Sequence, residues 1–587
     1  MPMMTGTCLL PGTAAGPLLF ADVGLSFMGG VDPASGTVID VHHPLRGDCV
    51  SGKVLAIPSG RGSCSGSLVM FQLLLNGHAP KALVFQHMEA ILTLGVVIAK
   101  ELFSKGIPIV LLSPEDFAAL ASARYATVHD GSVAVSDQAP ADIETKAHLP
   151  ELDLSGFKLA ETDRRFLAGA FGEAGKIAMR TIIRAAQLEG ADHLIDVEMA
   201  HIDGCFYHGP ASLQFVRKLR DLGGQVRVPT TMNAICVDRR QWKSLGVPEP
   251  LGASSDAVAD AYVEMGVRPT YTCAPYLLEG APRFGQQIAW AESNAVVFAN
   301  SVLGARTMKY PDYLDILVAI TGRAPAVDCH LPSHRRATLR IDVPTPRNPD
   351  DSFYPLLGYH IGKIATNEIP IVCGLEGLPV SHDDLKAFGA AFATTSAVAM
   401  FHILGVTPEA QRLEDAVGSN GVLRRVTVAP EALKETWREL NNATTPDVDL
   451  ISLGNPHFSL TECERLAALC AGRQKADHVE MIVTCGRDVY EKAKAAGHVE
   501  RIAAFGGRFL NDTCWCFIGE PVVAPAARNI LTNSGKYAHY GPAAVDRGFH
   551  FGSLERCVRA ACSGAVDTGL PDWLAGGGRA DSAGEAS

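Results

Sequence analysis

The residues best suited to chemistry are three serines and a cysteine in one loop, GRGSCSGS at residues 60–67. An apolar run precedes this loop and another follows it, which predicts a strand leading into the N-terminus of a helix. Unpaired backbone N–H groups and the positive end of a helix dipole favour anions there. Ser63, Ser65 and Ser67 could each add a hydroxyl, and Cys64 a thiol. An ordinary turn with a serine N-cap fits the same spacing, so the function of the loop stays open at this point.

A second set of polar residues follows short apolar runs later in the chain. The runs at 193–199, 225–228, 448–453, 505–510 and 529–531 each predict a strand. In open parallel α/β sheets, ligands bind beyond the carboxyl ends of the strands. One polar strand end is ordinary turn chemistry, but several together indicate a polar site facing a cleft. The residues at these ends include His201, Gly204, Cys205, Asn233, Asn455, His457, Cys514 and Lys536.

Three cysteines have settings that suit a metal ligand. Prolines bracket Cys273, Cys373 follows an apolar run, and Cys514 ends an Asp-Thr-Cys sequence. Cys329, between an aspartate and a histidine, is a further candidate. No Cys-x-x-Cys pair occurs, so a zinc ribbon or a ferredoxin-type cluster has no support. Free cysteine is usually a small buried hydrophobe, and these residues alone indicate only a possible metal enzyme.

Two cations could bind the anionic group of a substrate. Arg306 lies in a glycine-containing loop beside Asn300 and Ser301, where a guanidinium makes a good fork for a carboxylate or phosphate. Lys536 follows Asn-Ser-Gly at the predicted start of a helix. A solvated surface arginine or lysine would fit the same positions, so both residues are candidates.

The chain is too long for one core, and strands alternate with helices, which predicts a multi-domain α/β protein. Residues 1–140 predict a compact N-terminal domain, 141–154 a linker and 155–568 a larger region of several α/β subdomains. A long helix is expected over 161–188. The Gly/Ala/Ser-rich residues 569–587 predict a flexible tail.

The formal charge of −12, without any basic block, argues against binding to nucleic acid or to an anionic membrane. No apolar stretch is long enough to cross a bilayer, and the N-terminus lacks the features of a signal peptide. The 15 cysteines are too dispersed for a secreted disulfide scaffold. We therefore expect a soluble, cytoplasmic protein.

Taken together, these segments resemble the aconitase X family, an outlying branch of the aconitase superfamily. Residues 1–140 are similar to its swivel domain through the loop at 60–67, and residues 155–565 are similar to its catalytic part. In archaeal members the two parts are separate subunits, whereas here they are fused. The motifs that carry the catalytic match are Tyr271-Thr-Cys-Ala-Pro-Tyr, Ala289-Trp-Ala-Glu-Ser, Asn300-Ser-Val-Leu-Gly-Ala-Arg-Thr, Gly322-Arg-Ala-Pro, Asp512-Thr-Cys and Asn533-Ser-Gly-Lys.

The resemblance implies an aconitase-like catalytic region with parallel sheets and an N-terminal swivelling β/α domain. It also implies an iron-dependent hydro-lyase, and the fused form favours dehydration of an amino acid, cis-3-hydroxy-L-proline, to Δ1-pyrroline-2-carboxylate. Ser65 would be the base, as an alkoxide helped by backbone N–H groups and the helix dipole. Residues expected to bind the substrate are Ser63, Gly66, His201, Gly204, Cys205, Asn233, Asn300, Arg306 and Lys536.

By the same resemblance, Cys273, Cys373 and Cys514 would hold an iron–sulfur cluster, with Cys329 as the alternative to Cys373. Asn455 stands where archaeal members have a cysteine ligand, so the cluster cannot be held in the archaeal way. Three thiolates would leave coordination on the iron free for a substrate oxygen. A 2Fe–2S cluster is the favoured cofactor, with mononuclear iron and 4Fe–4S as alternatives.

Three other functions stay open. Dehydration of 5-phosphomevalonate would use the same scaffold but needs a cluster of cations for the phosphate, which the sequence does not show. A non-enzymatic iron-sensing or RNA-binding relative of aconitase is disfavoured by the negative charge. A metal-free cysteine or serine enzyme would contain no iron. The oligomeric state cannot be predicted from the sequence.

Overall fold

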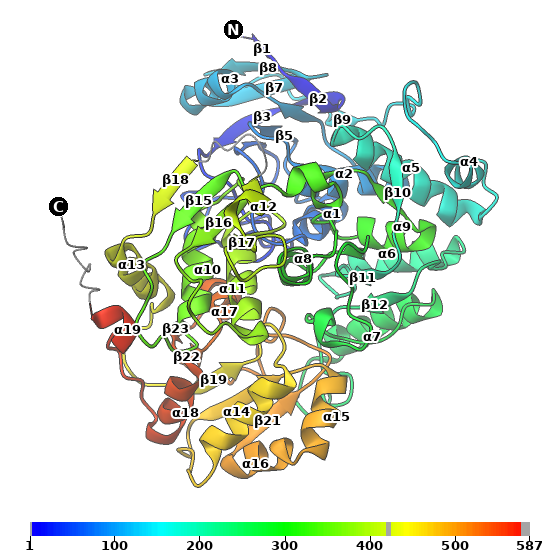
Figure 1. The fold of residues 1–587 in the computed structure, drawn as a ribbon. Helices are drawn as coiled ribbons and strands as arrows, with labels where there is room; N and C mark the ends of the chain where they lie inside the picture. Colours follow the sequence, from blue (N-terminus) through cyan, green and yellow to red (C-terminus); the bar gives the residue numbers. More distant parts are fainter. Residues whose placement is uncertain (1–2, 418–423, 577–587) are drawn as a thin grey trace, which may run out of the picture.

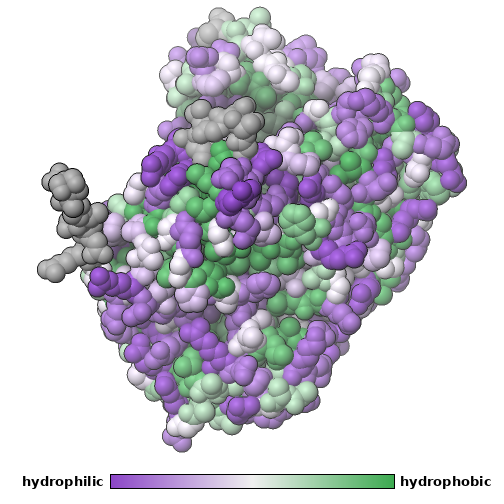
Figure 2. Space-filling view, viewed as in Figure 1, coloured by the Kyte–Doolittle hydropathy of each residue, from purple (hydrophilic) through white to green (hydrophobic). Residues whose placement is uncertain are grey.

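The computed structural model describes residues 3–417 and 424–576, so residues 577–587 of the predicted tail lie outside the described residues. An N-terminal lobe lies at the top of Figure 1, above three regions that each contain a parallel sheet. Figure 2 shows polar side chains over most of this face, with apolar patches across its middle. Within the described ranges, no helix combines the length and the apolar character needed to span a bilayer.

The N-terminal lobe is built on a mixed sheet with the strand order β1-β8-β7-β3-β4-β5-β6-β2, in which β9 also pairs with β3. The strands β3 to β6 are parallel neighbours, and helices α1 (Gly66–Asn76) and α2 (Ala90–Phe103) connect them. Strand β9 falls within the residues predicted to form a linker. The remaining elements are β1 (Met3–Thr5), β2 (Thr7–Leu10), β3 (Gly12–Phe20), β4 (Val54–Ala56), β5 (Ala82–Phe85), β6 (Ile109–Leu111), α3 (Pro114–Ala119), β7 (Tyr125–His129), β8 (Ser132–Ser136) and β9 (Lys146–Ala147).

The next region, residues 156–333, carries a small parallel sheet with the order β12-β11-β13. The predicted long helix is two helices, because Gly169 and Gly172 adopt φ values of +80° and +82°, which break the helical path. The elements are α4 (Glu161–Leu167), α5 (Gly172–Leu188), β10 (Leu194–Asp196), β11 (Ala200–Ile202), α6 (Pro210–Asp221), β12 (Thr230–Met232), α7 (Glu249–Glu264), β13 (Ala289–Trp290), α8 (Ser293–Phe298), α9 (Leu314–Thr321) and β14 (Arg323–Pro325).

Two further parallel sheets complete the fold, with the orders β17-β16-β15-β18 and β21-β20-β19-β22-β23. They confirm the predicted α/β class with parallel sheets. The first contains β15 (Leu339–Asp342), α10 (Phe353–Ile364), β16 (Pro370–Cys373), α11 (His382–Thr395), β17 (His402–Ile403), α12 (Leu413–Val417), β18 (Arg424–Thr427) and α13 (Pro430–Leu440). The second contains β19 (Leu450–Leu453), α14 (Leu460–Cys470), β20 (Glu480–Thr484), α15 (Arg487–Ala495), α16 (His498–Phe505), β21 (Gly507–Leu510), β22 (Asn529–Thr532), α17 (Gly535–Val545), β23 (Gly548–Phe551), α18 (Leu554–Ser563) and α19 (Asp572–Ala575).

Helix α1 joins the N-terminal lobe to the region below it. The helix is buried along most of its length, and its residues belong to one hydrophobic cluster that continues into α5, α6 and α9. The ring of Phe71 packs edge-on against Phe215 and Tyr313, with centroids 5.9 and 5.2 Å away. This packing holds the N-terminus of α1, and with it the serine-rich loop, against the rest of the molecule.

Candidate active site

The loop at 60–67 connects β4 to α1, as the sequence predicts. Ser65 occupies the N-cap position of α1, yet its side chain makes no capping hydrogen bond. Instead its Oγ lies 3.3 Å from Oδ2 of Asp203 and 3.3 Å from Oγ of Ser63. Ser65 is only 3% exposed. The hydroxyl is therefore enclosed at a helix N-terminus and directed toward a carboxyl group instead of capping the helix.

Several hydrogen bonds hold this loop against residues 309–312. Oγ of Ser67 donates to the carbonyl of Asp312 at 3.3 Å, and the backbone N–H of Asp312 donates to the carbonyl of Cys64 at 3.4 Å. Nζ of Lys309 donates to the carbonyl of Gly62 at 2.6 Å. These bonds fix the position of the loop relative to Asp203.

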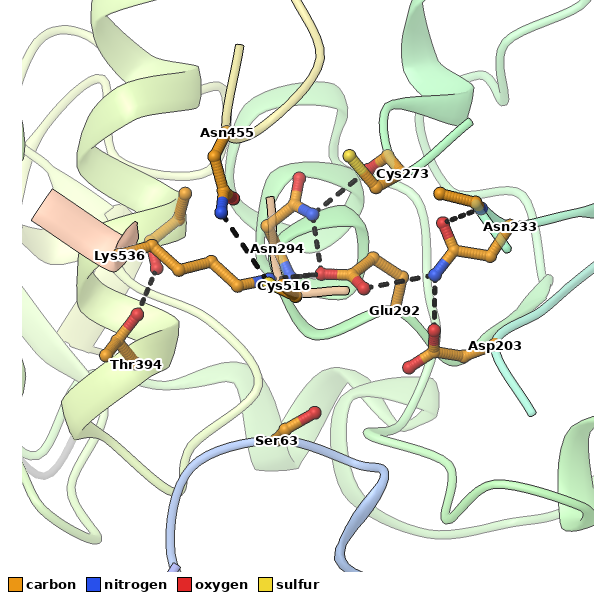
Figure 3. Close-up of polar contacts among 12 residues, drawn as sticks. Ser63, Asp203, Asn233, Cys273, Glu292, Asn294, Thr394, Asn455, Cys516 and Lys536 are labelled. Carbon is orange, nitrogen blue, oxygen red and sulfur yellow. Dashed lines mark hydrogen bonds and ion pairs between the residues drawn. The ribbon is translucent and has the colours of Figure 1, made fainter. Parts of the chain in front are cut away.

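Asp203 belongs to a chain of polar side chains that links three strand ends (Figure 3). Asp203 follows β11, Asn233 follows β12 and Glu292 follows β13, and these three strands are neighbours. Nδ2 of Asn233 donates to Oδ1 of Asp203 and, at 3.2 Å, to Oε2 of Glu292. Nζ of Lys536, on the first turn of α17, lies 2.8 Å from Oε1 of Glu292. The carboxyl ends of parallel strands thus converge on one buried polar site.

The carboxyl groups in this site differ in how readily they ionise. Burial raises the pKa of Glu292, but the Lys536 ammonium more than offsets this and the pKa falls to about 2. Burial and repulsion from Glu292 raise the pKa of Asp203 well above its usual range. Burial, helped by repulsion from Asp203, does the same for Asp312, and burial raises the pKa of Asp315 to about 6. One carboxylate is therefore firmly ionised, while the others hold protons more readily than usual.

Three sulfurs gather on the other side of Glu292. Cys273 and Cys514 share a small hydrophobic cluster, and Cys516 packs against it. Backbone N–H of His457 donates to Sγ of Cys273 at 3.4 Å, and Nδ2 of Asn455 donates to Sγ of Cys516 at 3.6 Å. The thiol contact with Cys514, helped by Lys536, lowers the pKa of Cys516 to about 7. Cys516 is therefore readily deprotonated to a thiolate.

The donor set suits an iron–sulfur group in its chemistry. Three thiols lie together, and N–H groups point at two of their sulfurs, as is usual around iron–sulfur clusters. Among residues 3–417 and 424–576, however, no group of three or more His, Cys, Asp or Glu side chains has the geometry of a metal-ion site. The sulfurs are neighbours but are not arranged around a single ion.

Cys373 and Cys329 do not join these sulfurs. Cys373 ends β16 in a different sheet and packs with Ala337 and Ile371, because its strand pairs with β15 and β17. Cys329 lies in the hydrophobic core beneath that same sheet. The structure thus places Cys516 where the sequence prediction places Cys373.

The predicted substrate-binding residues divide into two groups. Those that the structure brings close to Ser65 and Glu292 are Ser63, Gly66, Gly204, Asn233 and Lys536. Others have structural partners: Asn300 is bonded to Thr307 and Ala399, Nδ1 of His201 contacts Thr231, and Cys205 contacts the carbonyl of Asn233. The backbone of Arg306 pairs with that of Gln287 in an isolated β-bridge, and Arg306 lies near His330.

Several residues of this site were not among the sequence predictions, namely Asp203, Glu292, Lys309, Asp312 and Cys516. The sequence could have indicated Glu292 as a site residue, because it is an isolated charge in the apolar stretch 288–299. The sequence could also have indicated Cys516, because it lies only two residues after Cys514. Nothing in the sequence indicates Lys309, since its hydrogen-bond partners lie far away in the chain.

Four family models, which together match most of the chain, place it in one family. Models named Aconitase X swivel domain, first domain, second domain and third domain match residues 3–136, 156–333, 337–438 and 448–563. Cis-3-hydroxy-L-proline dehydratase of Hypocrea jecorina is 53% identical over 97% of both chains. The protein of the same name from Pseudomonas aeruginosa is 50% identical over 96% of this chain and 97% of its own.

A solved structure agrees with these matches. The holo-form of aconitase X from Thermococcus kodakaraensis superposes with a TM-score of 0.63 and 31% identity, covering 69% of this chain and all of its own. The relatives that match nearly end to end are dehydratases, and dehydratases are hydro-lyases. Four consecutive domain matches, with identities of 53% and 50% over nearly the whole chain, leave one assignment: this chain is a hydro-lyase that belongs to the aconitase X family.

Proposed function

We propose that the protein dehydrates cis-3-hydroxy-L-proline to Δ1-pyrroline-2-carboxylate and that Ser65 removes the Cα proton. The observation that carries this proposal is the Ser65 hydroxyl, which does not cap α1 but points into the buried site beside Asp203. Two relatives that match nearly the whole chain bear the name of this dehydratase.

A serine hydroxyl has a high pKa and needs help to act as a base. Ser65 stands at the N-terminus of the 11-residue helix α1, where free N–H groups and the helix dipole favour a developing negative charge. Asp203 accepts the hydrogen bond of the neutral hydroxyl and orients it, and its raised pKa lets it hold a proton that it can donate to the alkoxide. The base therefore combines a helix terminus with a neighbouring carboxyl group.

We further propose that Cys273, Cys514 and Cys516 hold an iron–sulfur cluster, with Cys516 in the place predicted for Cys373. A 2Fe–2S cluster is the favoured form, with mononuclear iron and 4Fe–4S as alternatives. When bound, the group would supply a Lewis acid for the C3 hydroxyl of the substrate. Asn455 and His457 would orient the sulfurs through their N–H groups.

Ser63, Gly66, Gly204, Asn233 and Lys536 stay in the proposed binding set, because each is bonded to, or next in the chain to, Ser65, Asp203 or Glu292. His201 lies beside Asn233 and Glu292 with its Nε2 buried and unpartnered among the described residues, so it also stays in the proposed set, whereas Cys205, Asn300 and Arg306 stay predictions. Cytoplasmic location and the absence of a nucleic-acid partner are likewise predictions. Asp203 and Glu292 join the proposed set as polar groups that line the site.

The alternative substrate, 5-phosphomevalonate, carries a phosphate dianion. The buried site holds four carboxyl groups, Asp203, Glu292, Asp312 and Asp315, of which Glu292 is ionised and paired with Lys536. Among the described residues, the unpaired cation near the serine loop is the single ammonium of Lys309, which can balance a carboxylate but not a phosphate dianion. The site's charge therefore favours hydroxyproline.

The test uses protein purified without oxygen. Iron and acid-labile sulfide are measured, and both substrates are assayed at equal concentration. We expect iron, turnover of cis-3-hydroxy-L-proline and no turnover of 5-phosphomevalonate. Turnover of phosphomevalonate alone would overturn the proposed substrate. Active protein without iron would overturn the proposed cofactor.

A variant tests the base separately. Ser65→Ala should lower kcat by about 1,000-fold, in the range that loss of a catalytic base costs, with unchanged iron content. Ser67→Ala is the matched control, because Ser67 lies in the same loop but bonds only to the carbonyls of Cys64 and Asp312. Full activity of Ser65→Ala would remove Ser65 from the mechanism.

A further inference from the structure

Three lysines are buried in the part of the chain that the structure describes: Lys309, Lys386 and Lys536. Two of them have a carboxylate partner, since Lys386 pairs with Glu462 and Lys536 pairs with Glu292. Lys309 forms no such ion pair with any described residue. A buried charge without a counter-ion is costly, so an uncompensated ammonium in an active-site region indicates an anion that arrives from outside.

The contacts of Lys309 place it between two separate parts of the molecule. Its Nζ donates to the carbonyl of Gly62 in the serine loop at 2.6 Å and to the carbonyl of Ser396, after α11, at 3.3 Å. An ammonium has three N–H donors, so one remains after these two bonds. Lys309 and Gly62 also line a cavity of about 380 Å³ between the N-terminal lobe and the regions below it.

The acids of this cavity compensate the lysine only in part, because burial lowers the pKa of Lys309 more than Asp328 raises it. Glu89, Glu189 and Asp328 line the same cavity. Burial raises the pKa of Glu89 to about 7 and that of Glu189 to about 8, and it also raises the pKa of Asp328. All three therefore hold protons more readily than free carboxyl groups do, which weakens their attraction for Lys309.

The other predicted anchors for the substrate carboxylate are less suitable. Lys536 is occupied by Glu292 at 2.8 Å. Arg306, whose buried Nε has no hydrogen-bond partner, lies beside Gln287 and His330 and has no hydrogen bond or ion pair with the serine loop among the described residues. Lys309 donates a hydrogen bond directly to that loop, at the carbonyl of Gly62, which lies three residues before Ser65.

We propose that Lys309 binds the α-carboxylate of the substrate through its remaining N–H donor. This inference rests on the proposed function. The carboxylate carbon and the proton that Ser65 removes are both attached to Cα, so the base and the carboxylate anchor must lie within a few ångströms of each other. Lys309 is bonded to Gly62, three residues before Ser65 in the same short loop, so anchor and base are held by one segment.

The anchor also assists the reaction. The Cα proton passes to Oγ of Ser65, the pair from the C–H bond forms the C2–C3 double bond, and the pair of the C3–O bond leaves with hydroxide. Hydroxide takes up a proton from solvent, and Ser65 later returns its own proton to solvent, so one water molecule is lost overall. The enamine that this leaves loses its N–H proton and gains one at C3, which gives Δ1-pyrroline-2-carboxylate. Lys309 keeps its protons and offsets the carboxylate's charge, which otherwise opposes removal of a proton from Cα.

The experiment compares cis-3-hydroxy-L-proline with its amide, cis-3-hydroxy-L-prolinamide, which lacks the carboxylate. Wild-type protein should prefer the acid. Lys309→Met should lower kcat/KM for the acid by about 100-fold or more, as loss of a buried charge-stabilising group does, while kcat/KM for the amide changes little. The preference for the acid is therefore expected to collapse. Lys309→Arg, which keeps the charge, should retain part of it.

Two controls separate binding from structure. Lys309→Gln can still donate to the two carbonyls but carries no charge, and it should also lose the preference if Lys309→Met fails to fold. Lys363→Met removes a half-exposed cation, paired with Glu439, that lines the neighbouring cavity, and it should keep the preference. Equal losses for acid and amide would show a structural bond only and would overturn the inference. Wild-type protein inactive on the acid would instead overturn the proposed function.

Discussion

At the scale of single residues, Glu292 is the centre of the site. It accepts hydrogen bonds from Asn233 and Asn294 and forms the ion pair with Lys536 (Figure 3). Asn294 also donates to the carbonyl of Cys273 at 3.0 Å, so this network reaches from the Ser65 side to the sulfurs. The network positions both halves of the proposed site relative to each other.

The buried pair should be strongly coupled. Glu292→Gln or Lys536→Met alone should destabilise the protein by about 3 kcal/mol, because each leaves an unpaired buried charge or donor. The double variant should lose less than the sum of the two, as measured by thermal unfolding of the four proteins. The exposed pair Lys492–Asp488 is the control and should show a coupling below about 1 kcal/mol. Simple additivity at Glu292 and Lys536 would show that their charges do not interact.

The assignment of the sulfurs can be tested by iron content. Cys516→Ser should lower bound iron and abolish the visible absorbance, because it removes one of the three clustered thiols. Cys373→Ser should leave iron unchanged, because Cys373 packs in a different cluster. Both variants are measured after anaerobic purification. Iron lost from Cys373→Ser and kept by Cys516→Ser would reverse the assignment.

At the scale of elements, two helix N-termini flank the serine loop. Helix α1 presents Ser65, and helix α2 is capped by Glu89, whose Oε2 accepts from the backbone N–H groups of Leu92 and Thr93 at 2.7 and 3.3 Å. A Cβ on Gly60 would lie only 2.7 Å from Oε1 of Glu89, so the buried carboxyl group also supports the loop. A larger residue at position 60 would have to displace this carboxyl group.

Glu89 should make stability depend on pH. Burial raises its pKa in the folded protein to about 7, from a usual value of 4.5, so the stability it contributes is fully present below pH 4.5 and is lost as the pH rises through about 7. Between pH 5 and pH 8 the loss amounts to about 2–3 kcal/mol. Glu89→Gln cannot ionise, so between pH 5 and pH 8 its Tm should fall less than that of the wild type.

The control for this prediction is Glu115→Gln, because Glu115 is exposed at the start of α3 and has no comparable burial. Its pH profile should follow that of the wild type. If Glu89→Gln also follows the wild type, Glu89 does not titrate in this range.

At the scale of the whole molecule, the N-terminal lobe is held to the rest by contacts outside the linker. Lys309 bonds to Gly62, Ser67 to the carbonyl of Asp312, and the backbone N–H of Ala211 donates to Oε1 of Gln72 at 3.0 Å. One hydrophobic cluster also runs through both parts. These contacts place Ser65 against Asp203 without any requirement for a covalent connection.

Cleavage of the linker should therefore preserve activity at high protein concentration. A protease site inserted after the exposed Gln138, between β8 and β9, would be cut after purification. The cut protein should keep most of its dehydratase activity when concentrated and lose it on dilution, because the lobe is no longer tethered. The same insertion left uncut is the control. Immediate loss at high concentration would show that the connection itself positions the loop.

Much of the fold could be predicted from the sequence because its signals are local. The strand, serine loop and helix at 60–67 follow from neighbouring residues, and so do the polar ends of the later strands. The break between α4 and α5 was missed, because the helical pattern of 161–188 continues across Gly169 and Gly172. Glycine only permits such a break, and packing of the two helices determines it.

The amino-acid sequence by itself determined the α/β class, the polar strand ends and the resemblance to aconitase X. Only the tertiary structure decided which of these ends meet: Cys516, not Cys373, joins Cys273 and Cys514, and Lys309 reaches the serine loop. The physical reason is that local order along a chain fixes strands and turns, whereas the order of strands in each sheet and the docking of one domain on another depend on contacts between residues far apart in sequence.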